Sequence, residues 1–441
     1  MLTNLPGLLK IDREVLFLCI GTALLTTGQG IAVPIVPLYA DTLGVTVAQV
    51  GLVITAFGLA RFLTNMPSAV LSDRIGRKWV LTAGAAIAAV GNVLSGFALS
   101  LEPLLAFRFI AGIGSAAFIT GAVIYISDVS QPTNRGRLMS LFQGSFLIGI
   151  TAGPALGGIV AEFFGLRAPF IAVGIVSAAS AVWVVLKVSE TRWLHQEVTA
   201  GSPAGSEEGQ TNTSNEGERS PWPSTTIPES RRLHGYGFMF RPDFALISLV
   251  FAGTFFTRGG AMFTLLPLKG SRDLGLSPGE IGLLLTLPSV FTFLLLPLVG
   301  VFTDRYGRKS AIVPGLLVFS VALLVLGLSP SIVMFGVGMV LYGIAQGLEG
   351  PAPVAYVSDV SPPRGQAVGQ GAARTLGDLA LLTAPPLMGL ASDIWGMTTT
   401  LIWNGVMMGI LGLAFWWFAG DPARRMAREA RATAASRPPP E

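Results

Sequence analysis

The chain has 441 residues, of which 51% are hydrophobic and 12% are charged, and its formal net charge is +4. Soluble proteins contain about 25% charged residues, so this composition excludes an ordinary water-soluble enzyme and favours a protein whose solvent is mostly lipid. The positive charges are dispersed among loops, which argues against a nucleic-acid-binding face.

Apolar segments long enough to cross a bilayer follow one another along the chain in two series of six. We expect the first series of transmembrane helices near residues 15–39, 48–71, 79–98, 103–126, 138–162 and 168–187. We expect the second series near residues 243–268, 279–302, 310–329, 331–356, 367–391 and 398–419. The predicted fold class is therefore an all-α polytopic membrane protein with twelve transmembrane helices.

Polar segments separate and flank the two series. Residues 188–242 are rich in Ser, Gly, Glu, Thr and Pro. This composition cannot bury enough apolar surface to offset the entropy of ordering, so it predicts a flexible linker. We expect residues 1–14 to form an N-terminal segment and residues 420–441 to form a tail. The two six-helix bundles then comprise residues 15–187 and 243–419.

The distribution of Lys and Arg among the loops predicts the orientation in the membrane. Of the 29 such residues, four lie inside the expected spans and three, Arg167, Lys269 and Arg272, lie in loops on one side. The remaining 22 lie on the side that carries both termini and the linker. Because positively charged loops resist translocation, we expect this side to face the cytoplasm, with the helices in the cell membrane.

An internal repeat relates the two series of helices. Residues 72–78 (SDRIGRK) recur as residues 303–309 (TDRYGRK), and residues 125–129 (YISDV) recur as residues 356–360 (YVSDV). Both pairs are separated by the same offset of 231 residues, which indicates a duplicated unit of six helices. We call two positions equivalent when this offset separates them. Six helices return the chain to its starting side, so the two copies share one topology. Such copies enclose a cavity that faces the two sides of the membrane in turn.

The doubled loop resembles the signature loop of the major facilitator superfamily, and the resemblance covers the chain apart from the linker and the tails. It implies a transporter of two pseudo-symmetric six-helix bundles, with the loop as a conformational latch. We expect Asp73 at a helix N-terminus, where the macrodipole favours an anion, and Arg77 paired with Asp128. For Lys78 and Lys309, an equally favoured alternative is that their positive charges only set the orientation of the helices in the membrane. The latch candidates are Asp73, Arg74, Gly76, Arg77, Lys78 and Asp128, with the copies Asp304, Arg305, Gly307, Arg308, Lys309 and Asp359.

Two further motifs resemble those of the drug/proton antiporter branch with twelve helices. Residues 108–116 (RFIAGIGSA), which include Arg108 and Gly112, are similar to the arginine-glycine motif that is linked to proton coupling in that branch. Residues 149–158 (GITAGPALGG) resemble the antiporter motif of these exporters. Glycines spaced by four also let another helix approach closely, so packing and bending are the favoured role of this motif. Its candidate residues are Gly149, Gly153, Pro154, Gly157 and Gly158.

Ionisable and polar residues inside the spans are candidates for the cavity and for proton coupling, because charge within a bilayer is costly. Glu349 lies about 15 Å from the membrane edge at 1.5 Å per residue, and either exchanges a proton or forms an ion pair with Arg258. Arg374 and Asp378 are one turn apart and are expected to pair. The arginines outnumber the acids, which favours anionic or neutral substrates. The candidates are Gln29, Arg61, Arg108, Gly112, Arg258, Glu349, Arg374 and Asp378.

These features predict proton-coupled export of a small organic or drug-like molecule. Proton-coupled import of a small organic anion on the same fold is an alternative, and a transport-inactive scaffold or receptor is a more remote one. The sequence has no phosphate-binding Gly-x-x-x-x-Gly-Lys-Ser/Thr motif, so we expect no ATP-driven step. We further expect no enzyme activity, no cofactor or metal, no nucleic-acid partner, and a monomer in the bilayer.

Overall fold

The computed structural model describes residues 5–131, 134–191, 237–362 and 365–420, apart from the side chains of residues 5–12 and of Asp304. Most of the expected linker, residues 192–236, and the tail from residue 421 onward lie outside the described residues.

Six long helices form the first bundle. They are α1 (Leu5–Asp41), α2 (Val47–Ile75), α3 (Arg77–Ser95), α4 (Leu101–Val129), α5 (Arg135–Phe164) and α6 (Ala168–Lys187). α1 begins inside the segment that was expected to precede it, whereas the other five helices match the expected spans to within a few residues.

The second bundle repeats this arrangement after a short 3-10 helix, η1 (Gly237–Phe240). It contains α9 (Pro242–Thr257), the π-helix η2 (Arg258–Leu265), α10 (Leu266–Arg272), α11 (Pro278–Tyr306), α12 (Lys309–Leu328), α13 (Ile332–Glu349), α14 (Ala352–Val360), α15 (Gln366–Trp395) and α16 (Met397–Phe418). α9, η2 and α10 form one continuous span, and α13 and α14 form another.

Eleven described spans are long and apolar enough to cross a membrane. α15 carries Arg374 and Asp378 within its length and falls outside this group, although its 30 residues give it ample length. Together with α15, the described residues contain the twelve helices that the sequence predicts.

The repeat fixes where equivalent helices begin. α2 starts with a capping box in which the Thr46 hydroxyl accepts from Gln49 N and the Gln49 side chain accepts from Thr46 N. α11 starts with the same box, formed by Ser277 and Glu280 at the equivalent positions of the second copy. Each box satisfies backbone donors that the first helical turn leaves unpaired.

Two equivalent glycines separate consecutive helices at the signature loops. Gly76 (φ 104°) lies between α2 and α3, and Gly307 (φ 92°) follows α11 just before α12. A positive φ of this size is unfavourable for other residues, so glycine lets the chain reverse direction within a single position.

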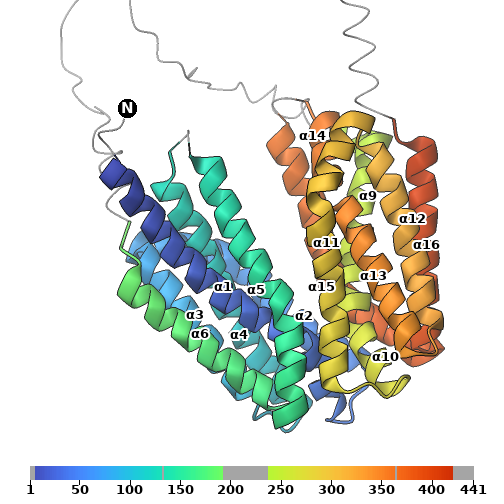
Figure 1. The fold of residues 1–441 in the computed structure, drawn as a ribbon, viewed down its shortest axis with the longest axis horizontal. Helices are drawn as coiled ribbons and strands as arrows, with labels where there is room; N and C mark the ends of the chain where they lie inside the picture. Colours follow the sequence, from blue (N-terminus) through green and yellow to red (C-terminus); the bar gives the residue numbers. More distant parts are fainter. Residues whose placement is uncertain (1–4, 132–133, 192–236, 363–364, 421–441) are drawn as a thin grey trace, which may run out of the picture.

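The two bundles lie side by side and approach each other at one end (Figure 1). We call the end where α1 begins, α6 ends, α9 begins and α16 ends the terminus side, and the opposite end the far side. α2 packs against α15, and α5 packs against α11, across the two bundles. The bundles diverge toward the terminus side, so the contacts that join them are concentrated on the far side.

Candidate functional site

The first signature loop holds a buried arginine between two helices. Arg77 is 3% exposed, and its Nε donates to Asp128 Oδ2 on α4 at 2.7 Å. Its Nη1 donates to the backbone oxygen of Ser72 at 3.1 Å, and its Nη2 lies 2.9 Å from Asp73 Oδ1. Arg77 therefore ties the start of α3 to the ends of α2 and α4, as the expected pairing requires.

The prediction for Asp73 is wrong, because another carboxylate occupies the helix N-terminus. α2 continues through Ile75, so Asp73 lies in its last turn and is 70% exposed. The first amides of α3 instead donate to Glu190, from Arg77 N at 2.8 Å and from Lys78 N at 3.2 Å. Glu190 follows α6 and reaches this position through the tertiary fold, which the local sequence pattern did not reveal.

The second signature loop is more open. Arg308 Nε lies 3.0 Å from Asp359 Oδ2, with both side chains partly exposed. Lys309 donates to the backbone oxygen of Ala419 at 2.7 Å. Arg74 and Arg305 are exposed at the ends of their helices, and the side chain of Asp304 lies outside the described residues.

The glycine motif of α5 faces two different helices. A Cβ at Gly149, Gly153 or Gly157 would overlap the backbone or a side chain of α1, so these three glycines let α5 lie directly against α1. Gly158 instead faces α11, where a Cβ would lie 2.9 Å from Gly282 Cα. The motif thus serves packing within the first bundle and contact between the bundles.

Contacts between the bundles occur in two equivalent copies. A Cβ at Gly282 of α11 would overlap the backbone oxygen of Pro154 on α5, and a Cβ at Gly51 of α2 would overlap that of Pro385 on α15. Gly51 and Gly282 are equivalent positions of the repeat, as are Pro154 and Pro385. The internal duplication therefore produced two copies of one close helix contact on the far side.

Carboxylates strengthen the same contacts. Asp393 at the end of α15 accepts hydrogen bonds from Val47 N and Ala48 N at the start of α2, each at 2.9 Å. The equivalent residue, Glu162 at the end of α5, accepts one from Gly279 N at the start of α11 at 3.0 Å. Each carboxylate lies at a helix N-terminus, where the macrodipole favours an anion.

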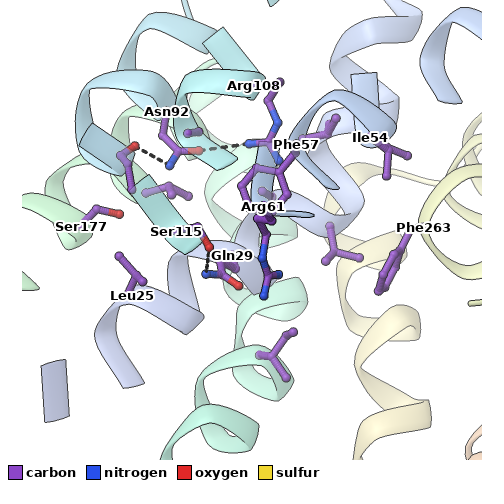
Figure 2. A pocket seen from close by; sticks show the side chains of 17 residues that line it. Leu25, Gln29, Ile54, Phe57, Arg61, Asn92, Arg108, Ser115, Ser177 and Phe263 are labelled. Atoms are coloured by element: carbon purple, nitrogen blue, oxygen red, sulfur yellow. Dashed lines mark hydrogen bonds between the residues drawn. The ribbon is translucent and has the colours of Figure 1, made fainter. Parts of the chain in front are cut away.

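A pocket of about 130 Å³ is lined by the first bundle and by Phe263 of η2, and its polar residues come from five helices of the first bundle (Figure 2). The Cζ atoms of Arg108 and Arg61 lie 4.6 Å and 5.9 Å from the ring centroid of Phe57. Arg108 Nη1 donates to Asn92 Oδ1 at 3.1 Å, and Gln29 Nε2 donates to Ser115 Oγ at 2.7 Å. The pocket brings together Gln29, Arg61 and Arg108, three of the residues that the sequence singled out.

Gly112 lies beside this pocket and has a packing role. A Cβ at this position would lie 2.7 Å from the Cβ of Ala60, so glycine lets α4 approach α2 closely. Phe57 and Asn92 are further functional candidates that sequence reasoning did not assign, because an aromatic or amide side chain inside a span has no distinctive spacing.

A second pocket, of about 260 Å³, lies in the second bundle and is lined by Arg258, Glu349 and Arg374, among others. Glu349 is 4% exposed, and its Oε2 accepts a hydrogen bond from Thr254 Oγ1 at 2.7 Å. Its Oε1 is buried without a hydrogen-bond partner among the described residues. The polar partner of this carboxylate is therefore a threonine.

Neither the expected pair of Arg374 with Asp378 nor the alternative pair of Glu349 with Arg258 is formed in this conformation. Within the described part of the chain, no ion pair shorter than 4.0 Å joins Glu349 to Arg258 or Arg374 to Asp378. Arg374 and Asp378 are one turn apart on α15, but both lie within electrostatic range of Arg61 on α2. The charges of Arg374 and Asp378 thus act on Arg61 in a neighbouring helix.

The sequence matches the family model described as Major Facilitator Superfamily over residues 18–276 and 270–440. An uncharacterised MFS-type transporter of Methanocaldococcus jannaschii is 31% identical over 41% of this chain and 47% of its own length. The Escherichia coli arabinose-proton symporter is 25% identical over 78% of this chain and 77% of its own length. The Staphylococcus aureus quinolone resistance protein NorA is 23% identical over 41% and 46%. The alignments with the first and the last of these span just under half of each relative.

Solved structures share the fold. A bacterial homologue of the human lysosomal transporter Spinster, in an inward-facing and unoccupied conformation, superposes with a TM-score of 0.71 at 18% identity over 92% of this chain and 96% of that one. The nucleoside transporter NupG gives 0.70 at 15% identity over 92% and 98%. The human organic anion transporter MFSD10 gives 0.56 at 18% identity over 92% and 99%. These likenesses confirm the all-α fold class.

Proposed function

The chain belongs to the Major Facilitator Superfamily, and on that premise we propose that it is a secondary active transporter that exports a small organic or drug-like molecule in exchange for protons. The family is one of multi-pass membrane transporters, so the chain is not an enzyme. We place it in the drug/proton antiporter branch on the strength of its antiporter-like motif in α5 and its similarity to NorA.

The observation that carries this proposal is the position of the contacts between the bundles. Gly51 with Pro385 and Gly282 with Pro154 hold the bundles together on the far side, while the bundles diverge on the terminus side. The pockets that contain Arg108 and Glu349 lie in different bundles. Separation of the far-side contacts, with closure of the terminus side, exposes such pockets to each compartment in turn.

The signature loops contribute to this cycle as latches. Arg77 with Asp128 and Arg308 with Asp359 join helices within a bundle, so each bundle moves as a unit. Asp73 is free to change partners when the terminus side closes, because its side chain is largely exposed in the present conformation.

Glu349 is the candidate proton carrier. Its buried carboxyl has one hydrogen bond from Thr254 and one oxygen without a partner among the described residues. A neutral carboxylic acid costs less free energy in an apolar bundle than a carboxylate does. Glu349 therefore binds a proton when its pocket is closed to water and releases the proton when water enters. Arg258 and Arg374 line the same pocket and provide positive charge beside the deprotonated form.

Substrate-dependent proton flux in proteoliposomes tests the proposal. We expect an imposed pH gradient to drive accumulation of at least one compound from a panel of small organic anions and neutral molecules. Glu349→Gln should abolish the coupled proton flux, whereas Glu102→Gln, which removes an exposed carboxylate in the first turn of α4, should leave it unchanged. Equal flux in Glu349→Gln and wild type overturns the role of Glu349, and no driven flux for any compound overturns the transport function.

Symport of a small organic anion on the same fold is the second candidate function. The two arginines of the first pocket and the similarity to a proton symporter favour it. Inside-out vesicles with an imposed pH gradient separate the two directions, because antiport brings substrate in as protons leave and symport moves both the same way. The scaffold alternative predicts that deletion of residues 198–228 abolishes function, whereas a transporter retains its flux.

The orientation is part of the proposal. We place residues 1–14, 188–242 and 420–441 in the cytoplasm and the bundles 15–187 and 243–419 in the cell membrane, since 22 of the 29 Lys and Arg residues lie on that side. In intact cells, a membrane-impermeant maleimide should therefore fail to label cysteines placed at either terminus of the protein.

A further inference from the structure

We propose that the pocket of the first bundle binds the carboxylate of a small organic anion with a flat apolar body, and that Arg108 holds this carboxylate. The inference rests on the proposed transport function, since it names the substrate class of the cavity through which transport occurs.

Arg108 is a buried cation whose donors are not all used. Its side chain is 5% exposed, and Nη1 donates to Asn92 Oδ1 at 3.1 Å. The buried Nε–H has no hydrogen-bond partner among the described residues. A charged group with an unpaired donor is costly in a low-dielectric interior, and an incoming anion removes that cost.

No carboxylate lines this pocket in the part of the chain that the structure describes. Gln29 contributes a neutral amide from α1, and that amide donates to Ser115. Asp378 lies within electrostatic range of Arg61, and the positive charge of Arg374 opposes the effect of Asp378 on Arg61. Arg108 has no ion pair with any described residue, so the positive charge of the pocket is left for a ligand to neutralise.

The repeat shows that the fold does not require this cation. The position equivalent to Arg108 in the second copy is Met339, and the position equivalent to Asn92 is Leu323. Both of these apolar residues are fully buried in the second bundle. The first copy therefore carries a buried polar pair where the second copy packs hydrocarbon, which points to a ligand of the first bundle.

The remaining walls define the rest of the ligand. The Phe57 ring lies below the Arg108 guanidinium, and Leu25, Ile54 and Phe263 add apolar surface (Figure 2). The volume of about 130 Å³ is close to the roughly 150 Å³ of an engineered apolar cavity that binds benzene, which suits a single ring. The planar guanidinium matches the two oxygens of a carboxylate, so the pocket selects a planar monocarboxylate.

Three probes that share one ring test the assignment: benzoate, benzamide and benzylamine are anionic, neutral and cationic. We expect calorimetry on the full-length protein in nanodiscs at pH 7 to show benzoate binding at least tenfold tighter than benzamide, with benzylamine weaker still. Arg108→Gln should reduce benzoate to the level of benzamide. Arg167→Gln is the matched control, because it removes an exposed positive charge outside the pocket and should keep the preference.

The ranking in the wild-type protein decides the matter even where Arg108→Gln does not fold. Equal or tighter binding of benzamide or benzylamine, no benzoate binding at 10 mM, or an unchanged preference in folded Arg108→Gln overturns the assignment. Binding is measured without a gradient, so an intact anion preference without any driven flux overturns the transport proposal alone. Driven flux of neutral or cationic compounds with no anion preference overturns the present inference alone.

Discussion

Asp41 and Arg272 occupy equivalent positions in the two copies of the repeat and form an ion pair with each other. Asp41 ends α1 and Arg272 ends α10, so the pair joins the two bundles on the far side. Two equivalent positions can touch only close to the axis that relates the copies. The pair therefore lies beside the pseudo-twofold axis, at the far-side interface of the two bundles.

Removal of this ion pair should shift the protein toward a conformation with an open far side. Because both side chains are partly exposed, we expect Arg272→Gln to cost about 0.2–1 kcal/mol, which changes the ratio of the two conformations by up to about fivefold. Spin labels at Leu99 and Pro330, equivalent exposed loop positions on the far side, report the distance between the bundles. Arg167→Gln should leave the distances unchanged, and the charge swap Asp41→Arg with Arg272→Asp should restore them.

The close contact at Gly282 should be essential for closure of the far side. We expect Gly282→Ala to reduce transport about tenfold or more and to increase labelling of far-side cysteines, since the added Cβ overlaps the backbone oxygen of Pro154. Gly300→Ala is the matched control in the same helix, because no atom lies within 4 Å of the Cβ position there. Equal transport in the two variants would contradict a gating role of this contact.

The two signature loops should differ in their contribution to stability. Asp128→Asn removes the buried carboxylate that pairs with Arg77 and leaves only the exposed one of Asp73, and we expect a loss of about 3 kcal/mol in the free energy of unfolding. Asp359→Asn affects a pair that is partly exposed, so we expect a loss of about 1 kcal/mol. Thermal unfolding of the two variants in the same detergent compares them, and equal losses would show that burial does not govern the difference.

Asp73→Asn should slow turnover while leaving abundance and thermal stability close to wild type. The carboxylate is largely exposed and contacts Arg77 from the preceding turn, a kind of pair that contributes little to folding. Asp273→Asn is the matched control, since Asp273 contacts Lys269 at the same spacing and the same distance of 2.9 Å on the far side. Unchanged flux in Asp73→Asn removes this residue from the latch.

The sequence predicted the twelve helices, the repeat and the pairing of Arg77 with Asp128, because apolar length and a constant offset between copies are properties of the chain itself. It did not predict Glu190 at the start of α3 or Thr254 beside Glu349, since tertiary packing brings these side chains to their partners. The offset between the copies already relates Glu162 to Asp393 and Asp41 to Arg272. A comparison of polar residues at equivalent positions could therefore have pointed to the far-side contacts from the sequence alone.

Pro278 makes the two far-side interfaces unequal. It is equivalent to Val47, whose amide donates to Asp393, but a proline has no amide hydrogen to donate to Glu162. The interface of α5 with α11 thus holds one hydrogen bond at the helix start, where the interface of α2 with α15 holds two. We therefore expect the contact of α5 with α11 to part more readily than the contact of α2 with α15 when the far side opens.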